Sequence, residues 1–269
     1  DLHDCYYDKD TQWPEGFTVD QSKALFIGPD ADLFAKKLSS INLHKANLRG
    51  ADLGCSDLTY ANLSSANLQD VDFREADLRY ANLSGANLTN ANLGEVDLRH
   101  ANLDGVDLTD ADLSDTNLSE VDLSAVCLEG TKLYDTILHK SNLQHVNFSK
   151  SDLNGTDLQQ ANLSGMDLRT VKLECVNLSR ANLENVNFCN GNLSHTDLHH
   201  ANLSGANLQG VDLRNSELIG SILTGVNLQQ ANLSEETILN DVNISNADLS
   251  GANLSGAILL NARLREVNL

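Results

Sequence analysis

This 269-residue chain is short of basic residues, proline and aromatic residues, and it has no long hydrophobic run. Its 18 Lys and Arg face 38 Asp and Glu, a net charge of −20. Such a charge argues against a nucleic-acid-binding surface, because phosphate contacts need basic side chains. No apolar stretch approaches the roughly 18 residues of a membrane span, so none is predicted. We therefore expect a protein partner that is basic or uncharged.

Cysteine and proline are also scarce. The five cysteines are an odd number, which favours a reducing compartment, and we expect a cytoplasmic location. A disulfide between Cys5 and Cys55 stays open as an alternative to free thiols. Both prolines, Pro14 and Pro29, lie in the first thirty residues. The chain begins at Asp1 without Met, and we expect a processed chain or an excised domain.

What the chain has instead is a repeat of five residues. An apolar residue occupies every fifth position from Leu33 to Leu233, and after one inserted residue the pattern runs on from Leu239 to Leu269. These 48 centres comprise 44 Leu, three Phe and one Ile. A period of five fits neither an α-helix nor a simple strand, so the pattern predicts a stack of repeats.

Each position of the unit has its own chemistry. The residue two before the centre is small or β-branched, and we expect it to point inward beside the centre. The residue just before the centre is Asn or Asp in 38 of the 48 units, which suits tight turns. The two residues after the centre are mostly polar or Gly and predict the corners. The expected core is represented by Phe73, Leu83, Phe148, Leu158 and Phe188.

The Ala-(Asp/Asn)-Leu-x-x units over residues 31–269 resemble the pentapeptide-repeat family. The resemblance implies an all-β fold, a right-handed quadrilateral β-helix with four units per turn, so that 48 units make about 12 coils. At roughly 4.8 Å between hydrogen-bonded strands, the rod is about 55 to 60 Å long. The stretch from Thr11 to Phe17 is similar to the lead-in of cyanobacterial members.

The composition divides the chain into two parts. Residues 1–30 hold both prolines and several aromatic residues, and they predict an N-terminal capping segment, whereas residues 31–269 form the solenoid. The run Thr18-Val19-Asp20-Gln21 has the form of a capping box and predicts a short helix over residues 22–27. The extra residue between 233 and 239 shifts the phase by one, and we expect a bulge at a corner there.

Residues twenty apart share a face if each coil holds twenty residues, and we name the four faces by their first centres, Leu33, Leu38, Leu43 and Leu48. The Leu33 face is acidic, and the Leu43 face is nearly neutral and rich in Asn. The Leu38 face collects basic and aromatic residues, which we interpret as a recognition stripe. The stripe comprises Tyr60, Arg79, Tyr80, Arg99, His100, His139, Lys140, Arg180, His199 and His200.

The outward positions of the Leu38 face turn apolar near the C-terminus. They form a candidate interface of Ile219, Ile238, Ile258 and Leu260. A cluster of exposed aliphatic residues on one face indicates an interface, although Ile in place of Asn in a flat strand is an alternative. Together with an uncovered strand edge on the last coil, the cluster predicts association through the C-terminal end, for example as a homodimer.

No pattern in the sequence predicts catalysis, a cofactor or a metal site. The carboxylates stand in open rows without a cleft, and a Leu-filled solenoid offers no pocket to shift a pKa. His195, His199 and His200 lie near one corner, but exposure to solvent explains them better than a metal. Phosphate-binding, nucleophile-elbow and calcium-repeat motifs are all missing. We therefore expect that the protein is not an enzyme.

Two functions are compatible with these features. The first is a rigid scaffold that presents rows of side chains for protein–protein interaction. The second is mimicry of nucleic acid towards a DNA-binding protein such as gyrase, which members of the resembled family protect. The repeats carry 31 acids and 16 bases. Over a rod of roughly 57 Å this gives one net charge per about 4 Å, against one per 1.7 Å in duplex DNA, which favours the scaffold.

Overall fold

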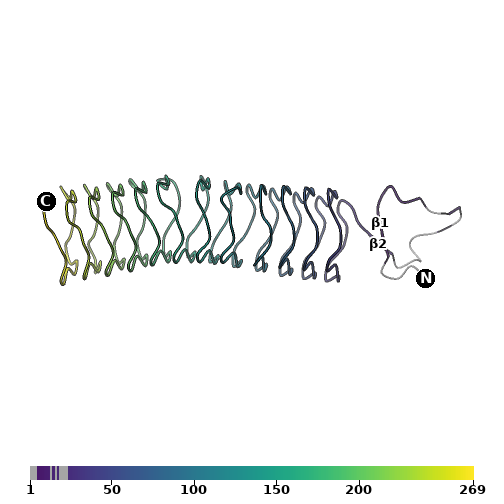
Figure 1. Ribbon diagram of the computed structural model, residues 1–269, viewed down its shortest axis with the longest axis horizontal. Helices are drawn as coiled ribbons and strands as arrows, with labels where there is room; N and C mark the ends of the chain where they lie inside the picture. The colour runs from purple at the N-terminus through teal and green to yellow at the C-terminus, as the bar shows by residue number, and fades with distance from the viewer. Residues whose placement is uncertain (1–4, 13, 16, 18–23) are drawn as a thin grey trace.

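The computed structural model describes residues 5–12, 14–15, 17 and 24–269. Figure 1 shows a long rod with the N-terminal segment at one end and the C-terminus at the other. In the part of the chain that is described, regular strands are limited to β1 (Tyr6–Tyr7) and β2 (Leu25–Phe26), which pair in parallel. No described helix is long and apolar enough to cross a membrane.

The rod is a β-helix whose coils are joined by isolated parallel bridges. Bridges link residues twenty apart, such as Asp32 with Asp52 and Asp52 with Asp72. Twenty residues are four units, so each coil has four sides with one bridge on each. The strand on each side is too short to be a regular β-strand, and the fold depends on the vertical stacking of coils.

Every backbone N–H of a typical unit has an acceptor, as the unit from Ala51 to Cys55 shows. The Ala51 N–H bonds the carbonyl of the preceding centre at 3.0 Å and closes the corner. The Asp52 N–H bonds the previous coil at 2.9 Å, and the Leu53 and Cys55 N–H groups bond the next coil at 2.8 Å. The Gly54 N–H bonds the Asp52 carboxylate at 3.0 Å. Proline would break this pattern at any of the five positions.

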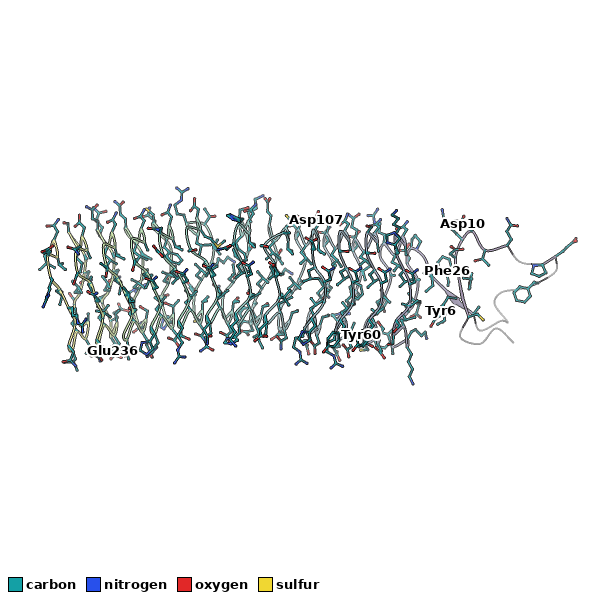
Figure 2. The ribbon with its side chains drawn as sticks, in the orientation of Figure 1. Tyr6, Asp10, Phe26, Tyr60, Asp107 and Glu236 are labelled. Atoms are coloured by element: carbon teal, nitrogen blue, oxygen red, sulfur yellow. The ribbon has the colours of Figure 1, made fainter. Side chains whose placement is uncertain are left out.

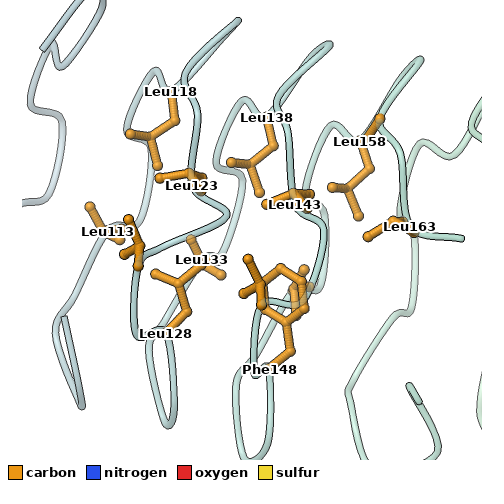
Figure 3. Close-up of a cluster of buried hydrophobic side chains, with 14 of the residues drawn as sticks. Leu113, Leu118, Leu123, Leu128, Leu133, Leu138, Leu143, Phe148, Leu158 and Leu163 are labelled. Atoms are coloured by element: carbon orange, nitrogen blue, oxygen red, sulfur yellow. The ribbon is translucent and has the colours of Figure 1, made fainter. Parts of the chain in front are cut away.

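The centres from Leu33 to Leu249 form columns of buried side chains along the axis. Phe73, Leu83, Leu158 and Phe188 have no exposed surface, and Phe148 is 2% exposed. Figure 3 shows Leu118, Leu138 and Leu158 stacked in three successive coils. Each coil thus contributes a layer that is apolar above and below, and no coil can bury its core without neighbours.

The inserted residue lies at a corner, and the core continues past it. Glu235 and Glu236 both adopt left-handed backbone conformations, with φ of 57° and 67°. The next bridge joins Glu217 to Ile238, which are 21 residues apart. Leu239 is fully buried and Leu249 is 2% exposed, so the inward positions keep their direction beyond the insertion.

Pairing between coils weakens in the middle of the rod. Every centre from Leu33 to Leu93 and from Leu178 to Leu249 donates its N–H to the next coil, whereas six centres between them do not. Over the same range the inward neighbour of the centre becomes larger. Eight of the ten such residues from 46 to 91 are Ala, against three of the seventeen from 96 to 176. Larger inward residues alone do not account for the missing bonds, because only five of the fourteen such residues from 181 to 247 are Ala and every centre there keeps its bond.

The N-terminal segment differs from the expected helix. Residues 18–23 lie outside the described residues, but Leu25 and Phe26 form strand β2, so the prediction of a helix is wrong for that part. The Leu25 and Ile27 N–H groups bond the carbonyls of Cys5 and Tyr7, both at 2.7 Å. Strand pairing with residues twenty positions earlier is more stable here than a single helical turn, because isolated short helices are unstable. Phe26 and Ile27 pack against the core.

Truncating one central leucine tests the core assignment. We expect Leu158→Ala to lower the free energy of unfolding by about 2 to 5 kcal/mol, because it leaves a cavity between stacked coils. Leu260→Ala is the matched control, since Leu260 is 64% exposed and should change stability by less than about 0.5 kcal/mol. Chemical unfolding followed by circular dichroism measures both. Equal losses in the two variants would contradict the assignment.

Candidate interaction surface

Three aromatic rings of the recognition stripe stack along the rod. The ring centroids of Tyr60 and Tyr80 are 4.9 Å apart with planes at 6°, and those of Tyr80 and His100 are 4.8 Å apart at 18°. All three residues occupy the second corner position of their units, where φ is between 60° and 63°. The coil spacing therefore sets the ring spacing. Figure 2 shows Tyr60 on the outside of the rod, near the N-terminal end.

The rings remain open to solvent at their edges. Tyr60 is 60% exposed and Tyr80 is 47% exposed. Each ring covers a face of its neighbour, and the rest of both tyrosine side chains is open to solvent. The stack is thus a ridge with a fixed spacing rather than a pocket, and it suits contact with another macromolecule better than enclosure of a small ligand.

Two arginines beside the stack are held by aspartates of their own units. Arg79 donates to Asp77 through Nε at 2.9 Å and Nη2 at 2.6 Å. Arg99 makes the same pair of bonds to Asp97, at 2.9 Å and 2.6 Å. Arg79 Nε also lies 3.7 Å from the Asp97 carboxylate in the next coil. The guanidinium groups are therefore oriented before any partner binds.

These ion pairs lower the pKa of both carboxyl groups. The side-chain hydrogen bonds from Arg79 and Arg99 are the largest cause for Asp77 and Asp97 respectively, and partial burial opposes them. The Asp77 bond likewise raises the pKa of Arg79. All four groups keep their charge at neutral pH, so this stretch of the stripe is nearly neutral within an acidic rod.

The remaining stripe residues do not join this cluster. Lys140 lies 3.4 Å from Glu120, and the corners at Glu120 and Gln160 separate the aromatic stack from the later members. His199 is held by Asp197 at 2.6 Å and faces Glu217 at 3.5 Å. His139 is half-buried and Arg180 is exposed. The stripe therefore consists of one compact stretch and several isolated side chains.

The C-terminal aliphatic residues lie on adjacent coils. Bridges connect Glu217 to Ile238 and Ile238 to Ile258. Ile258 is 39% exposed and Leu260 is 64% exposed, whereas Ile219 and Ile238 are half-buried. Ile222, 43% exposed, adds an apolar side chain around the corner.

The roles of Asp77 and Asp97 were not predicted from the sequence. Both stand two residues before an arginine, and the same Asp-Leu-Arg order gives bidentate pairs at Asp167 with Arg169 and at Asp212 with Arg214. The order within the unit was the available signal, because both side chains point outward on either side of an inward leucine.

No cluster of three or more metal-ligating side chains occurs in the described part of the chain. Cys55, an exposed thiol at a corner, has a raised pKa, caused by desolvation first and by the carboxylates of Glu75 and Asp52 next. A raised pKa keeps the thiol protonated, which disfavours its use as a nucleophile.

Comparison with protein families identified a match along the repeats. The family model described as pentapeptide repeats (8 copies) matches residues 30–64, 56–94, 91–130, 136–174, 177–215, 201–235 and 237–269. No match was found among curated proteins.

Solved structures of similar proteins include HetL, a pentapeptide repeat protein involved in heterocyst differentiation regulation from the cyanobacterium Nostoc sp. strain PCC 7120. It is 30% identical over 82% of this chain and 89% of its own, with a TM-score of 0.41. QnrB1, a plasmid-mediated fluoroquinolone resistance protein, is 14% identical over 87% of this chain and 93% of its own, at a TM-score of 0.30. Rfr23 from the cyanobacterium Cyanothece 51142 is 18% identical over 59% and 90%, at 0.14.

The arginine pairs generate a prediction about acid stability. A carboxyl group with a lowered pKa stabilises the fold above its unfolded pKa of about 3.9 and loses this contribution as the pH falls through its folded pKa. Arg79→Gln should let the pKa values of Asp77 and Asp97 rise, so acid unfolding should begin at a higher pH than in the parent. Arg180→Gln, at an exposed arginine without an ion pair to a described residue, is the control. Identical acid-unfolding midpoints for both variants would contradict the assignment.

Proposed function

Because the chain belongs to the pentapeptide-repeat family, we propose that it is a rigid, non-enzymatic scaffold that presents rows of side chains to a protein partner. The rod that carries these rows has about twelve coils by the count of repeat centres, with a cap on the first coil. The observation that carries the proposal is the exposed stack of Tyr60, Tyr80 and His100.

The stack is not explained by stability alone. Many equivalent corners have Gly. Placing a residue with a Cβ in the left-handed conformation costs about 1 kcal/mol of conformational free energy relative to Gly. Stacking of two exposed rings contributes about 0.5 to 1.5 kcal/mol, which only offsets that cost. Aromatic rings at these corners therefore give little net stability over Gly or Asn. Presentation of a fixed aromatic ridge to a partner accounts for their presence.

Charge defines the kind of partner. The stack and its locked arginines are nearly neutral, whereas the neighbouring Leu33 face carries acidic corners at Glu75, Glu95, Asp115 and Asp135 in four successive coils. A protein surface that combines an apolar or aromatic contact with flanking basic residues would match both faces. Direct binding of nucleic acid is disfavoured by the same acidic rows.

Nucleic-acid mimicry is the weaker alternative. A mimic needs a dense row of unpaired negative charges, and several carboxylates of this rod are paired with cations. Lys132 and Lys172 bind Asp112 and Asp152 on the Leu33 face at 3.0 and 2.6 Å. The net charge density of the rod, which already counts these lysines, is below that of duplex DNA.

The five cysteines support a reducing location such as the cytoplasm. All are free thiols, and Cys5, Cys55 and Cys175 are exposed. Exposed thiols without a disulfide partner are typical of proteins in reducing compartments. The scaffold proposal does not depend on this location.

Replacing two rings of the stack tests the scaffold proposal. We expect a Tyr60→Asn, Tyr80→Asn double variant to fold like the parent, because Asn tolerates the left-handed corner, and to lose a protein partner that the parent retains. Tyr134→Asn is the matched control, since Tyr134 is 54% exposed but lies on the Leu33 face. Affinity purification from the source cells, compared by mass spectrometry, is the measurement. A partner set that is the same for all three proteins would refute the role of the stack.

We further propose that Ile219, Ile238, Ile258 and Leu260 form a contact for association through the C-terminal end, with a homodimer as the simplest assembly. A two-fold contact on this end would close the assembly rather than extend it. Ile238 and Ile258 stand where most units have Asn or Asp, so they add apolar surface without a role in the corner hydrogen bond.

The dimer contact has its own test. We expect Ile238→Asn with Ile258→Asn to leave the circular dichroism spectrum unchanged and to weaken self-association at least tenfold. Sedimentation velocity over a range of concentrations compares this variant with Ile137→Asn, a control at an exposed Ile of the same unit position in mid-rod. A parent that stays monomeric at high micromolar concentration removes the proposal.

A further inference from the structure

The N-terminal end of the solenoid is covered on only part of its circumference. The Tyr6 hydroxyl donates to the Lys37 carbonyl at 3.2 Å, and the Asp30 N–H donates to the Arg49 carbonyl at 2.9 Å. Between these two attachment points lies a cavity of about 800 Å³. Residues 6–11, 27–29 and 41–47 line it. Figure 2 places Tyr6 and Asp10 on the segment beyond the end of the rod.

The rod wall of this cavity is an open strand edge. One coil further on, the Asn62 and Asn67 N–H groups donate to the Ile41 and Ala46 carbonyls, at 2.8 and 2.9 Å. The N–H groups of Asn42 and Asn47 hold the same positions in the first coil, and neither bonds a described residue. By the same register, the carbonyls of Asn42, His44 and Asn47 face the cavity without a backbone donor among the described residues.

The core is also incomplete at this edge. One coil further on, the equivalent inward residues Ala61 and Ala66 are 0% and 1% exposed. Ile41 and Ala46, which point inward below the cavity, are only partly buried. The cavity therefore offers backbone hydrogen bonds and apolar surface together, which is the combination that an added β-strand uses.

The charge at this end of the rod favours an acidic segment over a basic one. Residues 31–50 carry Lys36, Lys37, Lys45 and Arg49 against the single Asp32, a net +3 in a chain of net −20. Lys9 and Lys45 line the cavity, and neither has an ion pair with a described residue. Both acids in the lining, Asp8 and Asp10, lie on the N-terminal segment, and Asp8 accepts hydrogen bonds from the Asp10 N–H and the Thr11 hydroxyl, whereas the rod wall at residues 41–47 carries Lys45 and no acid.

We propose that this edge binds an extended acidic segment of a partner protein as an added β-strand. Main-chain groups of the segment pair with the N–H of Asn42 and Asn47 and with the carbonyls between them. Its inward side chains are apolar and cover Ile41 and Ala46, and its outward side chains are acidic and lie near Lys9 and Lys45. The site is separate from the aromatic stack, and the stack variants leave it intact, so either proposal can fail without the other.

The backbone donors allow a sharp test with proline. Asn42→Pro and Asn47→Pro each remove an N–H that bonds no described residue, so the fold should survive, since proline is tolerated on edge strands. Asn42→Ala and Asn47→Ala remove the same side chains but keep the N–H. The probe is a fluorescein-labelled peptide that alternates Val and Glu over six residues, and fluorescence anisotropy measures its binding. We expect saturable binding to the parent and to both Ala variants, and at least tenfold weaker binding to both Pro variants.

Two further probes keep the result interpretable if a Pro variant unfolds. The same peptide with alternate N-methylated amides cannot pair as a strand and should bind the parent at least tenfold more weakly. A peptide that alternates Val and Lys should also bind at least tenfold more weakly. The proposal is overturned if the parent shows no saturable binding or if Pro and Ala variants bind alike. It is also overturned if the N-methylated or Lys peptide binds as well as the Glu peptide, or if the edge binds a second copy of the chain instead.

Discussion

The five-residue unit is governed by the need to satisfy every backbone N–H. Two bonds run to the next coil, one to the previous coil and one across the corner, which leaves the N–H after the centre without a main-chain acceptor. The side chain of Asn or Asp supplies it, as in the bond from Gly54 to Asp52. Few side chains carry an acceptor that reaches the N–H two residues further along the chain. Asn and Asp do so from a residue that also fits an extended strand. This requirement explains why one polar position is nearly constant in a surface that otherwise varies.

The same hydrogen-bond pattern decides where variation is allowed. The second corner residue must adopt a left-handed conformation, yet its side chain points to solvent, so Gly, Asn, Glu, Tyr and His all occur there at a modest cost. Identical residues in successive coils then stand one coil spacing apart, which is close to the distance at which aromatic rings stack. The backbone therefore sets the spacing of a row of equivalent side chains, and the sequence sets which side chains occupy it.

Much of this architecture follows from the sequence because its period is local and strict. The burial of Phe73 or Leu158 requires only the position within the unit. The strand at Leu25 and Phe26 was not predictable in this way, since it depends on pairing with Tyr6 and Tyr7 across a segment without a repeat. The bidentate contact of Arg79 with Asp77 depends on rotamers, and the missing inter-coil hydrogen bonds of Leu98 and Leu103 have no counterpart in the repeat pattern. Such cooperative features are set by neighbours in space rather than by the period.

Because the backbone is regular, specificity for a partner must come from exposed side chains on the coils or from places where the repeat ends. Along most of the rod, backbone donors and acceptors are paired within the molecule and cannot bind a partner. The aromatic stack lies on the regular part without altering its hydrogen bonds, whereas the edge at Asn42 and Asn47 lies where the repeats give way to the N-terminal segment. The first can recognise side chains and the second can recognise a main chain. A scaffold with both kinds of surface can hold one partner at its side and another at its end, with the distance between them fixed by the stacked coils.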